Sequence, residues 1–128
     1  MRICEDRQVP GGVMEPQLLK EIQMLHDQVC YALGDPKRLM ILYVLSNQPQ
    51  SVNDIADELD IPQPTVSRHL KILRERALVK ATRQGQSVYY ALADDRLIQA
   101  LELLRGILRD RILMQAQVVQ ADPKTDFS

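Results

Sequence analysis

The chain has 128 residues, of which 45% are hydrophobic and 26% are charged, and its net charge is −1. This composition is typical of one folded domain with a modest core, and it excludes a disordered chain. No apolar run approaches the roughly 18 residues of a membrane span, and no signal-peptide pattern opens the chain. We therefore expect a cytoplasmic protein without a membrane partner, whose two cysteines act as thiols or ligands.

The first third of the chain predicts an arm followed by two helices. Residues 1–14 are expected to form a flexible N-terminal arm, because Pro10 and the glycines that follow it break any regular element. A helix then begins at Pro16 and ends near Gly34. Its apolar residues alternate at spacings of three and four, which is one helical stripe: Leu18, Ile22, Leu25, Val29 and Ala32. Asp35 caps a second, largely buried helix that begins with Pro36.

The middle of the chain predicts two short helices joined by a tight turn. Ser51 caps the first of them, and residues 60–64 form the turn. The second helix runs from about Gln63 to Arg76. Its inner face carries Val66, Leu70 and Leu73. Its opposite face is polar or cationic at every position, with Gln63, Thr65, Ser67, Arg68, Lys71 and Arg74.

The last third predicts a β-hairpin and a long helix. Strands at 77–82 and 87–92 flank a turn at 83–86 that contains Gly85. A helix follows from Asp94 to about Val118, with an apolar stripe of Leu97, Leu101, Leu104, Leu108 and Ile112. A polar tail occupies 120–128. The predicted domain is therefore 15–119, and its fold class is mainly α with a small β-hairpin.

The charges are unevenly distributed despite the near-neutral total. Residues 51–60 contain four acidic residues and no Lys or Arg, whereas residues 65–86 contain six basic residues against Glu75 alone. DNA responds to the local field, so a near-neutral protein can bind it through one basic stretch. On charge alone, a solvated helix face explains this stretch as well. The order of the surrounding elements favours a nucleic-acid interface.

Two short helices followed by a basic hairpin form the winged helix-turn-helix plan. The second helix of the pair fits the major groove and presents side chains to base edges, while the hairpin reaches the adjoining backbone or minor groove. The residues predicted to bind DNA are Gln63, Thr65, Ser67, Arg68, His69, Lys71, Arg74, Arg83, Gln84 and Gln86.

At these motifs the chain resembles the ArsR/SmtB family of bacterial repressors. The matching segments are residues 32–42, 54–59, 63–74, 78–79 and 83–92. They follow one another in the family's order, and the resemblance covers roughly residues 16–118. It implies a sequence-specific transcriptional repressor that binds an imperfect inverted repeat in double-stranded DNA as a homodimer, until an effector releases it.

Apolar stripes at both ends of the chain also favour a homodimer formed through the first and last helices. A stripe of this kind can instead belong to the core of a single chain, but two long helices exceed what a modest core can cover. The predicted dimer interface consists of Leu18, Ile22, Leu25, Leu97, Leu101, Leu104 and Leu108.

The effector sites known in the family cannot be transferred to this chain. The start of the third helix has Ser51, Val52 and Asn53 where the family's arsenic site has cysteines, and residues 94–120 contain no histidine for its zinc site. Cys4, His26 and Cys30 remain, the latter two on one helical face. They suit a soft metal ion or metalloid as effector, or thiol-redox sensing; alternatively Cys30 is a buried structural residue and Cys4 is incidental. The fold itself requires no cofactor.

Two other functions are compatible with parts of this pattern. One is a winged-helix module that binds a protein partner and has no operator of its own, which the arginine-bearing hairpin disfavours. The other is a DNA-binding regulator that responds to no effector. We do not expect an enzyme, because the sequence has no paired-carboxylate pocket, phosphate-binding loop or nucleophile motif.

Overall fold

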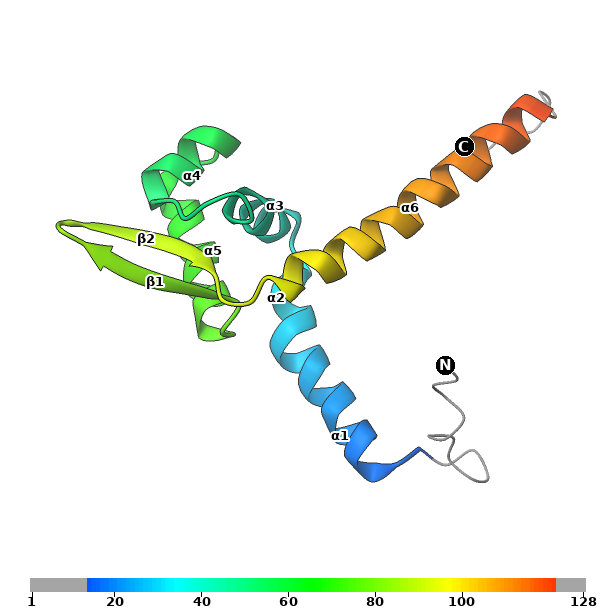
Figure 1. The fold of residues 1–128 in the computed structure, drawn as a ribbon, viewed down its shortest axis with the longest axis horizontal. Helices are drawn as coiled ribbons and strands as arrows, with labels where there is room; N and C mark the ends of the chain where they lie inside the picture. The colour runs from blue at the N-terminus through cyan, green and yellow to red at the C-terminus, as the bar shows by residue number, and fades with distance from the viewer. Residues whose placement is uncertain (1–13, 122–128) are drawn as a thin grey trace.

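The computed structural model describes residues 14–121, and the predicted arm and tail lie almost wholly outside this range. Its elements in chain order are α1 (Pro16–Met24), η3 (Leu25–Cys30), α2 (Tyr31–Leu33), α3 (Pro36–Leu45), α4 (Val52–Leu59), α5 (Gln63–Glu75), β1 (Val79–Gln84), β2 (Ser87–Leu92) and α6 (Arg96–Ala121). Helices α3, α4 and α5 and the hairpin form one body, from which α1 and α6 extend in different directions (Figure 1). The predicted class, mainly helical with a two-stranded hairpin, is confirmed.

The predicted helix starts are confirmed by their hydrogen bonds. An Asp35 carboxylate oxygen accepts from the backbone N–H of Lys37 at 2.7 Å, directly before α3. The Ser51 hydroxyl accepts from the N–H of Asp54 at 3.2 Å, directly before α4. Each side chain satisfies a donor that the first helical turn leaves without a partner. These caps fix where the two helices begin.

The core lies where α3, α4, α5 and the hairpin meet. The predicted inner face of α5 is confirmed, since Val66, Leu70 and Leu73 are each at most 1% exposed. They pack with apolar residues of the neighbouring elements: Ile41, Leu42, Ile55, Leu78, Val79, Leu92 and Leu101. Burial of this kind contributes roughly 25 cal/mol per Å² of apolar surface, so it holds α5 firmly by one face.

Strand β1 begins and ends two residues later than predicted, so the hairpin turn is tighter than the sequence predicts. Residue 84 pairs with residue 87, which leaves Gly85 and Gln86 as a two-residue loop, and Gly85 has a φ of 64°. A positive φ at the first loop position suits the primed turns that match strand twist. Arg83 and Gln84 therefore lie in β1 and not, as predicted, in the turn.

A short backbone bridge ties the hairpin to the helices. Gln50, in the connection between α3 and α4, exchanges both backbone hydrogen bonds with Tyr90 of β2, at 2.8 and 3.0 Å. The side chain of Gln50 is buried and donates to Glu58 at 3.4 Å. The hairpin is therefore anchored on its β2 side, which the sequence pattern did not indicate.

The first helical stretch departs from the single α-helix that was predicted. Residues Leu25–Cys30 are π-helical, and the N–H of Tyr31 donates to the carbonyl of His26, five residues earlier. A π turn holds more residues than an α turn, so it rotates the faces before and after it. The stripe through Leu25 and Val29 is therefore not continuous with a regular α-helical face.

The last helix begins at Arg96, two residues later than predicted, and Asp94 accepts from its backbone N–H at 2.9 Å. It continues to Ala121, the end of the described residues. Leu101, predicted for the dimer interface, is only 8% exposed and belongs to the core of this chain, and Leu97 packs against that core. Within residues 14–121, none of the helices combines the length and apolarity needed to cross a membrane.

The two extending helices leave much of their apolar surface uncovered within the chain. Neither α1 nor η3 contains a buried residue. The predicted interface residues Leu18, Ile22 and Leu25 are 40–52% exposed, and Leu104 and Leu108 are 61% and 57% exposed. Monomeric soluble proteins rarely expose apolar surface in contiguous stretches of this kind.

Helix α5 ends in a Schellman motif built around a residue that is not glycine. The N–H of Leu78 donates to the carbonyl of Leu73, and the N–H of Ala77 donates to that of Arg74, both at 2.9 Å. Ala77 consequently has a φ of 62°, in the left-handed region. An L-residue pays about 1–2 kcal/mol for this conformation, which is why glycine is usual at this position.

We expect Ala77→Gly to raise the free energy of unfolding by about 0.5–1 kcal/mol, because relief of the left-handed strain exceeds the added entropy of the unfolded chain. Denaturant unfolding measures the change. The matched control is Ala100→Gly on the exposed face of α6, which should instead lower the free energy of unfolding by up to about 1 kcal/mol. A loss of stability in both variants would contradict the assignment of strain to Ala77.

Candidate nucleic-acid interface

The outer face of α5 presents the polar residues that the sequence predicted for it. Because its inner face is fixed in the core, Gln63, Ser67, Arg68, Lys71 and Arg74 are exposed, and Thr65 is half-buried. An Arg68 guanidinium nitrogen lies 3.4 Å from the Thr65 hydroxyl, one turn earlier. This long contact leaves the guanidinium free to present its other donors outwards.

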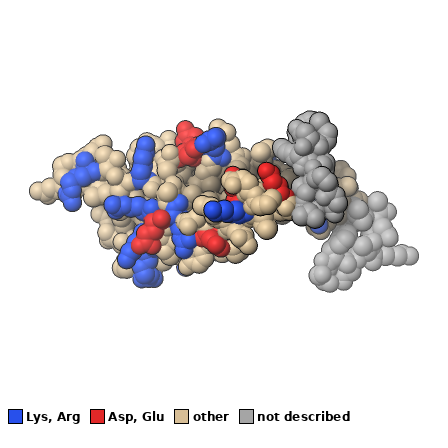
Figure 2. All heavy atoms as spheres, turned by 90° about the horizontal axis from the view of Figure 1, so that it is seen from below, with Lys and Arg blue, Asp and Glu red and all other residues tan. Residues whose placement is uncertain are grey.

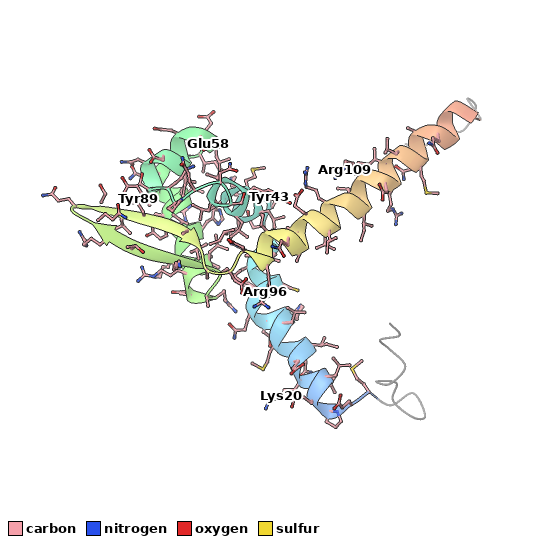
Figure 3. The ribbon with its side chains drawn as sticks, in the orientation of Figure 1. Lys20, Tyr43, Glu58, Tyr89, Arg96 and Arg109 are labelled. Carbon is pink, nitrogen blue, oxygen red and sulfur yellow. The ribbon has the colours of Figure 1, made fainter. Side chains whose placement is uncertain are left out.

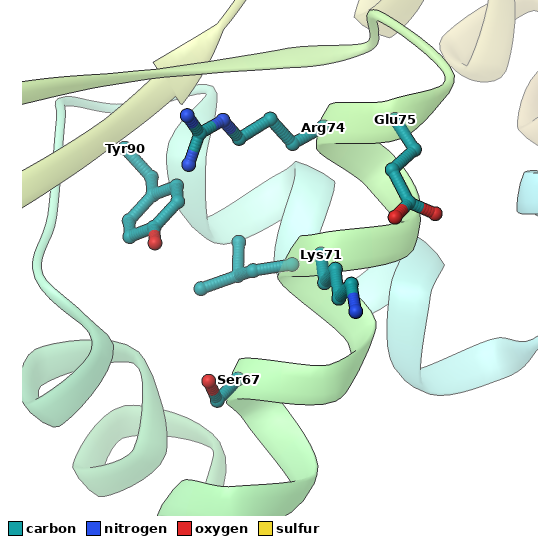
Figure 4. Close-up of a pocket in the computed structure, with 6 residues that line it drawn as sticks. Ser67, Lys71, Arg74, Glu75 and Tyr90 are labelled. Carbon is teal, nitrogen blue, oxygen red and sulfur yellow. The ribbon is translucent and has the colours of Figure 1, made fainter.

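A hollow of about 430 Å³ separates the outer face of α5 from the hairpin. Its lining consists of Ser67, Leu70, Lys71, Arg74, Glu75 and Tyr90. In Figure 4 the Arg74 side chain extends from α5 towards the Tyr90 ring, while Lys71 and Ser67 follow the same side of the helix. The lining carries two cations and one carboxylate, Glu75, so its net charge is positive and suits an anion such as a backbone phosphate.

A second hollow brings together predicted residues from the helix and the hairpin. It measures about 370 Å³, and its lining includes Gln63 at the start of α5 and Gln86 at the hairpin loop. These two residues are far apart in sequence, and only the fold makes them neighbours. Arg83 and Gln84 are exposed in β1 beside them, so the hairpin presents its polar residues at one end.

Basic residues gather on the part of the molecule that carries these hollows. In Figure 2 Lys and Arg are spread over the side where Figure 1 has the hairpin and α5. Figure 3 places the acidic residue Glu58 on α4, away from the hairpin loop. The uneven charge seen in the sequence is therefore also uneven in space, as binding of a polyanion requires.

His69 does not share the outer face of α5 with the other predicted residues. Its ring is half-buried against α3, and its Nδ1 lies 3.3 Å from a guanidinium nitrogen of Arg38. Burial disfavours the charged imidazolium and lowers the pKa of His69, although the carboxylate of Asp35 acts in the opposite direction. Contact with α3 gives His69 a structural role at this position, and its part in DNA binding stays a prediction.

The residues predicted to sense an effector are only partly described. Cys4 lies outside the described residues. Cys30 is an exposed free thiol in η3, and the Nδ1 of His26 lies 3.2 Å from a carboxylate oxygen of Asp27. Across residues 14–121, no three His, Cys, Asp or Glu side chains are grouped so that they could hold a metal ion. A site through these residues stays a prediction.

An apolar groove lies between α3 and α6. It measures about 230 Å³, and its lining consists of Leu39, Tyr43, Leu101, Leu104, Arg105 and Leu108. Figure 3 shows Tyr43 on α3 beside α6, and its hydroxyl donates to Glu102 at 2.6 Å. Arg105 also donates to Glu102, at 2.8 Å, and these two contacts lower the pKa of Glu102 to about 2. The groove therefore has an apolar floor and an ion-paired rim.

Sequence reasoning missed two side chains that hold α5 in place. Arg38 is buried and donates to the carbonyls of Ala32 and Tyr31 at 2.6 and 3.3 Å. Arg76, which follows α5, donates to the carbonyl of Asp27 and lies over the ring of Tyr31. Arg38 belongs to segment 32–42, which carries the family resemblance, whereas nothing in the sequence pattern indicated Arg76.

The chain is similar to known bacterial and archaeal regulators. Residues 35–81 match the family model "Bacterial regulatory protein, arsR family". An HTH-type transcriptional regulator of Methanocaldococcus jannaschii, MJ1325, is 44% identical over 60% of this chain and 88% of its own. NmtR, an HTH-type transcriptional regulator of Mycobacterium tuberculosis, is 35% identical over 77% of this chain and 78% of its own.

Among solved structures, one similar chain is the homodimeric winged helix-turn-helix DNA-binding domain of Mb0332 from Mycobacterium bovis. It aligns with a TM-score of 0.68 and 24% identity, and the match covers 81% of this chain and 94% of that domain. At this identity the likeness bears on the fold alone, and it confirms the winged helix-turn-helix architecture.

The half-buried ring of His69 predicts a loss of stability in mild acid. Because its pKa is lower in the folded protein than its ordinary value of 6.5, the unfolded chain binds more protons, and stability falls as the pH decreases below about 6.5. We expect His69→Gln to reduce this dependence when unfolding is measured between about pH 7.5 and 5.5. The control is His26→Gln, on an exposed ring; equal slopes in all three proteins would exclude His69 as the cause.

Proposed function

This chain belongs to the ArsR family of bacterial regulatory proteins and is a winged helix-turn-helix transcriptional regulator, and from that premise we propose that it is a repressor. In this proposal a homodimer binds an imperfect inverted repeat of double-stranded DNA and blocks transcription there. The observation that carries the proposal is the outer face of α5, which is polar along its length and lies beside a basic hairpin.

The geometry of this face supports base readout by α5. The helix is fixed by its apolar face, so the outer side chains are directed away from the core and can enter a major groove. Arg68, near the middle of the exposed face, has the donor geometry for guanine. Lys71, Arg74 and the hairpin residue Arg83 flank it, in positions suited to phosphates.

The exposed apolar faces of α1 and α6 support the homodimer. A second copy of the chain would cover Leu18, Ile22, Leu104 and Leu108, which are all at least 40% exposed. The groove between α3 and α6 continues this surface, since Leu104 and Leu108 belong to its lining. The similar domain of Mycobacterium bovis is homodimeric. Leu101 also lines this groove, but at 8% exposure it offers little surface to a second copy.

An effector that acts through the first helical stretch completes the proposal. Cys30 and His26 lie in η3, next to the proposed dimer interface, so a metal ion, a metalloid or an oxidant there would act on both copies. The participation of Cys4 depends on a segment outside the described residues. The chemical class of the effector is therefore proposed from the thiol and imidazole alone.

We expect Arg68→Ala to weaken binding to a duplex selected from a random-sequence pool by roughly 1–3 kcal/mol, and to relax the base preference at one position of each half-site. The matched variant Arg83→Ala should weaken binding to all sequences about equally and reduce the salt dependence. Fluorescence anisotropy at several salt concentrations separates the two effects. If Arg68→Ala leaves both affinity and base preference unchanged, α5 does not read the bases.

Two leucines on α6 test the dimer because they differ in exposure. Leu104→Glu places a charge on a 61% exposed position, so the single chain should still fold, whereas a dimer that buries this position should dissociate. Leu101→Glu, at 8% exposure, should unfold the chain. Sedimentation gives the mass and circular dichroism gives the folded fraction. A Leu104→Glu protein that stays dimeric would place the interface elsewhere.

A further inference from the structure

The helix that leads away from the body is held to it by few contacts. Neither α1 nor η3 contains a buried residue, and Figure 1 shows α1 leading away from the hairpin and α5. Val29 is only half-buried against the core. The direction of α1 relative to α5 therefore depends on the side chains at the point where η3 and α2 meet the end of α5.

That point is occupied by Arg76, the residue that follows α5. Its guanidinium donates to the backbone carbonyl of Asp27 in η3, and its Cζ lies 4.5 Å from the centre of the Tyr31 ring. Arg38 of α3 lies over the same ring at 5.7 Å and donates to the Tyr31 carbonyl at 3.3 Å. We call the contacts of Arg76 with Asp27 and Tyr31 the Arg76 joint.

The π-helical turn is part of this joint. Asp27 lies within η3, and Tyr31 directly follows it. The extra residue that a π turn contains rotates the segment before it relative to the segment after it. The Arg76 joint therefore contacts the chain at two points. Arg76 donates to a backbone carbonyl inside the π turn, and its guanidinium packs on the ring of the first residue after that turn.

The two halves of this contact have different physical origins. The bond to the Asp27 carbonyl is a charge-assisted hydrogen bond with a defined direction. The contact with the Tyr31 ring is a cation–π interaction, which a phenylalanine ring can also provide. Both are made by one side chain at the end of α5, so they fix the orientation of that helix end as well as its distance from η3.

We propose that Arg76 is a positioning residue for DNA binding: through Asp27 and Tyr31 it fixes the orientation of α5 relative to the dimer-forming helix α1. This inference rests on the proposed homodimer and its inverted repeat. The two copies of α5 must enter major grooves about one duplex turn apart. A rigid link from each α5 to the dimer interface sets this spacing before DNA binds. With a flexible link, binding to the second half-site costs additional free energy, because the helix must first be ordered.

The inference distinguishes Arg76 from a residue that contacts DNA itself. A lost phosphate contact weakens binding to a single half-site, weakens binding to the complete repeat still more because the contact is lost twice there, and reduces the salt dependence. A lost joint leaves each half-site contact intact and weakens only the simultaneous binding of two. A loss of half-site affinity or of salt dependence therefore marks a DNA contact, whereas a loss confined to the complete repeat reports the joint.

The experiment uses the full-length chain and two probes. One is the duplex selected from a random-sequence pool, and the other is the same duplex with one half of its repeat scrambled. Tyr31→Leu removes the ring without changing charge, and Tyr31→Phe is its matched control because the ring remains. Arg76→Ala removes the joint entirely, and Arg76→Lys restores the charge without the planar guanidinium. Tyr31 is 53% exposed and Arg76 is not buried, so the variants should fold.

We expect Tyr31→Leu and Arg76→Ala to lower affinity for the complete repeat by roughly fivefold to tenfold, with half-site affinity, salt dependence and dimer mass unchanged. Tyr31→Phe should match the wild type, Arg76→Lys should recover part of the loss, and the double variant should lose no more than the larger single effect. A loss of affinity for the half-site probe, or no loss on the complete repeat, would overturn the positioning role. A wild type without preference for the complete repeat would instead overturn the proposed dimeric binding, and the joint with it.

Discussion

The buried guanidinium of Arg38 is the contact on which the arrangement of the helices depends. From α3 it reaches the carbonyls of Ala32 and Tyr31 and the ring of His69 on α5, so one side chain joins three segments. A buried cation without acceptors costs several kcal/mol, which makes any packing that separates these segments unfavourable. The described residues contain no buried side-chain nitrogen or oxygen without a hydrogen-bond partner. Specific orientation of α5 thus comes from polar contacts, added to non-directional apolar burial.

Helix α5 is consequently constrained on every side except the one that faces outwards. Val66, Leu70 and Leu73 hold it in the core, and the hairpin that flanks it is fixed by the backbone bridge between Gln50 and Tyr90. The hollow between the helix and β2 keeps its shape because each of its two walls is held by contacts of its own. A rigid support of this kind loses less conformational entropy on binding than a flexible surface does.

The sequence predicted the parts of the fold that local chemistry decides. Asp35 and Ser51 indicated their helix starts because capping depends on neighbours two or three residues away, and the inner face of α5 followed from helical spacing. The π turn could not be predicted, since its hydrogen bonds change the backbone without changing the residue pattern. Arg76 and His69 find their partners far along the chain. Leu101 was misassigned because a leucine stripe does not tell which chain covers it.

The absence of buried residues in α1 and η3 has a consequence for regulation in the cell. A helix that buries nothing in its own chain gains its stability from the second copy, so in the proposed dimer folding of α1 and association are one equilibrium. The concentration of the DNA-binding species then rises with the square of the monomer concentration until the chain is mostly dimeric. Changes in chain concentration through synthesis and dilution would therefore change the DNA occupancy of such a repressor more steeply than that of a protein that binds as a single chain.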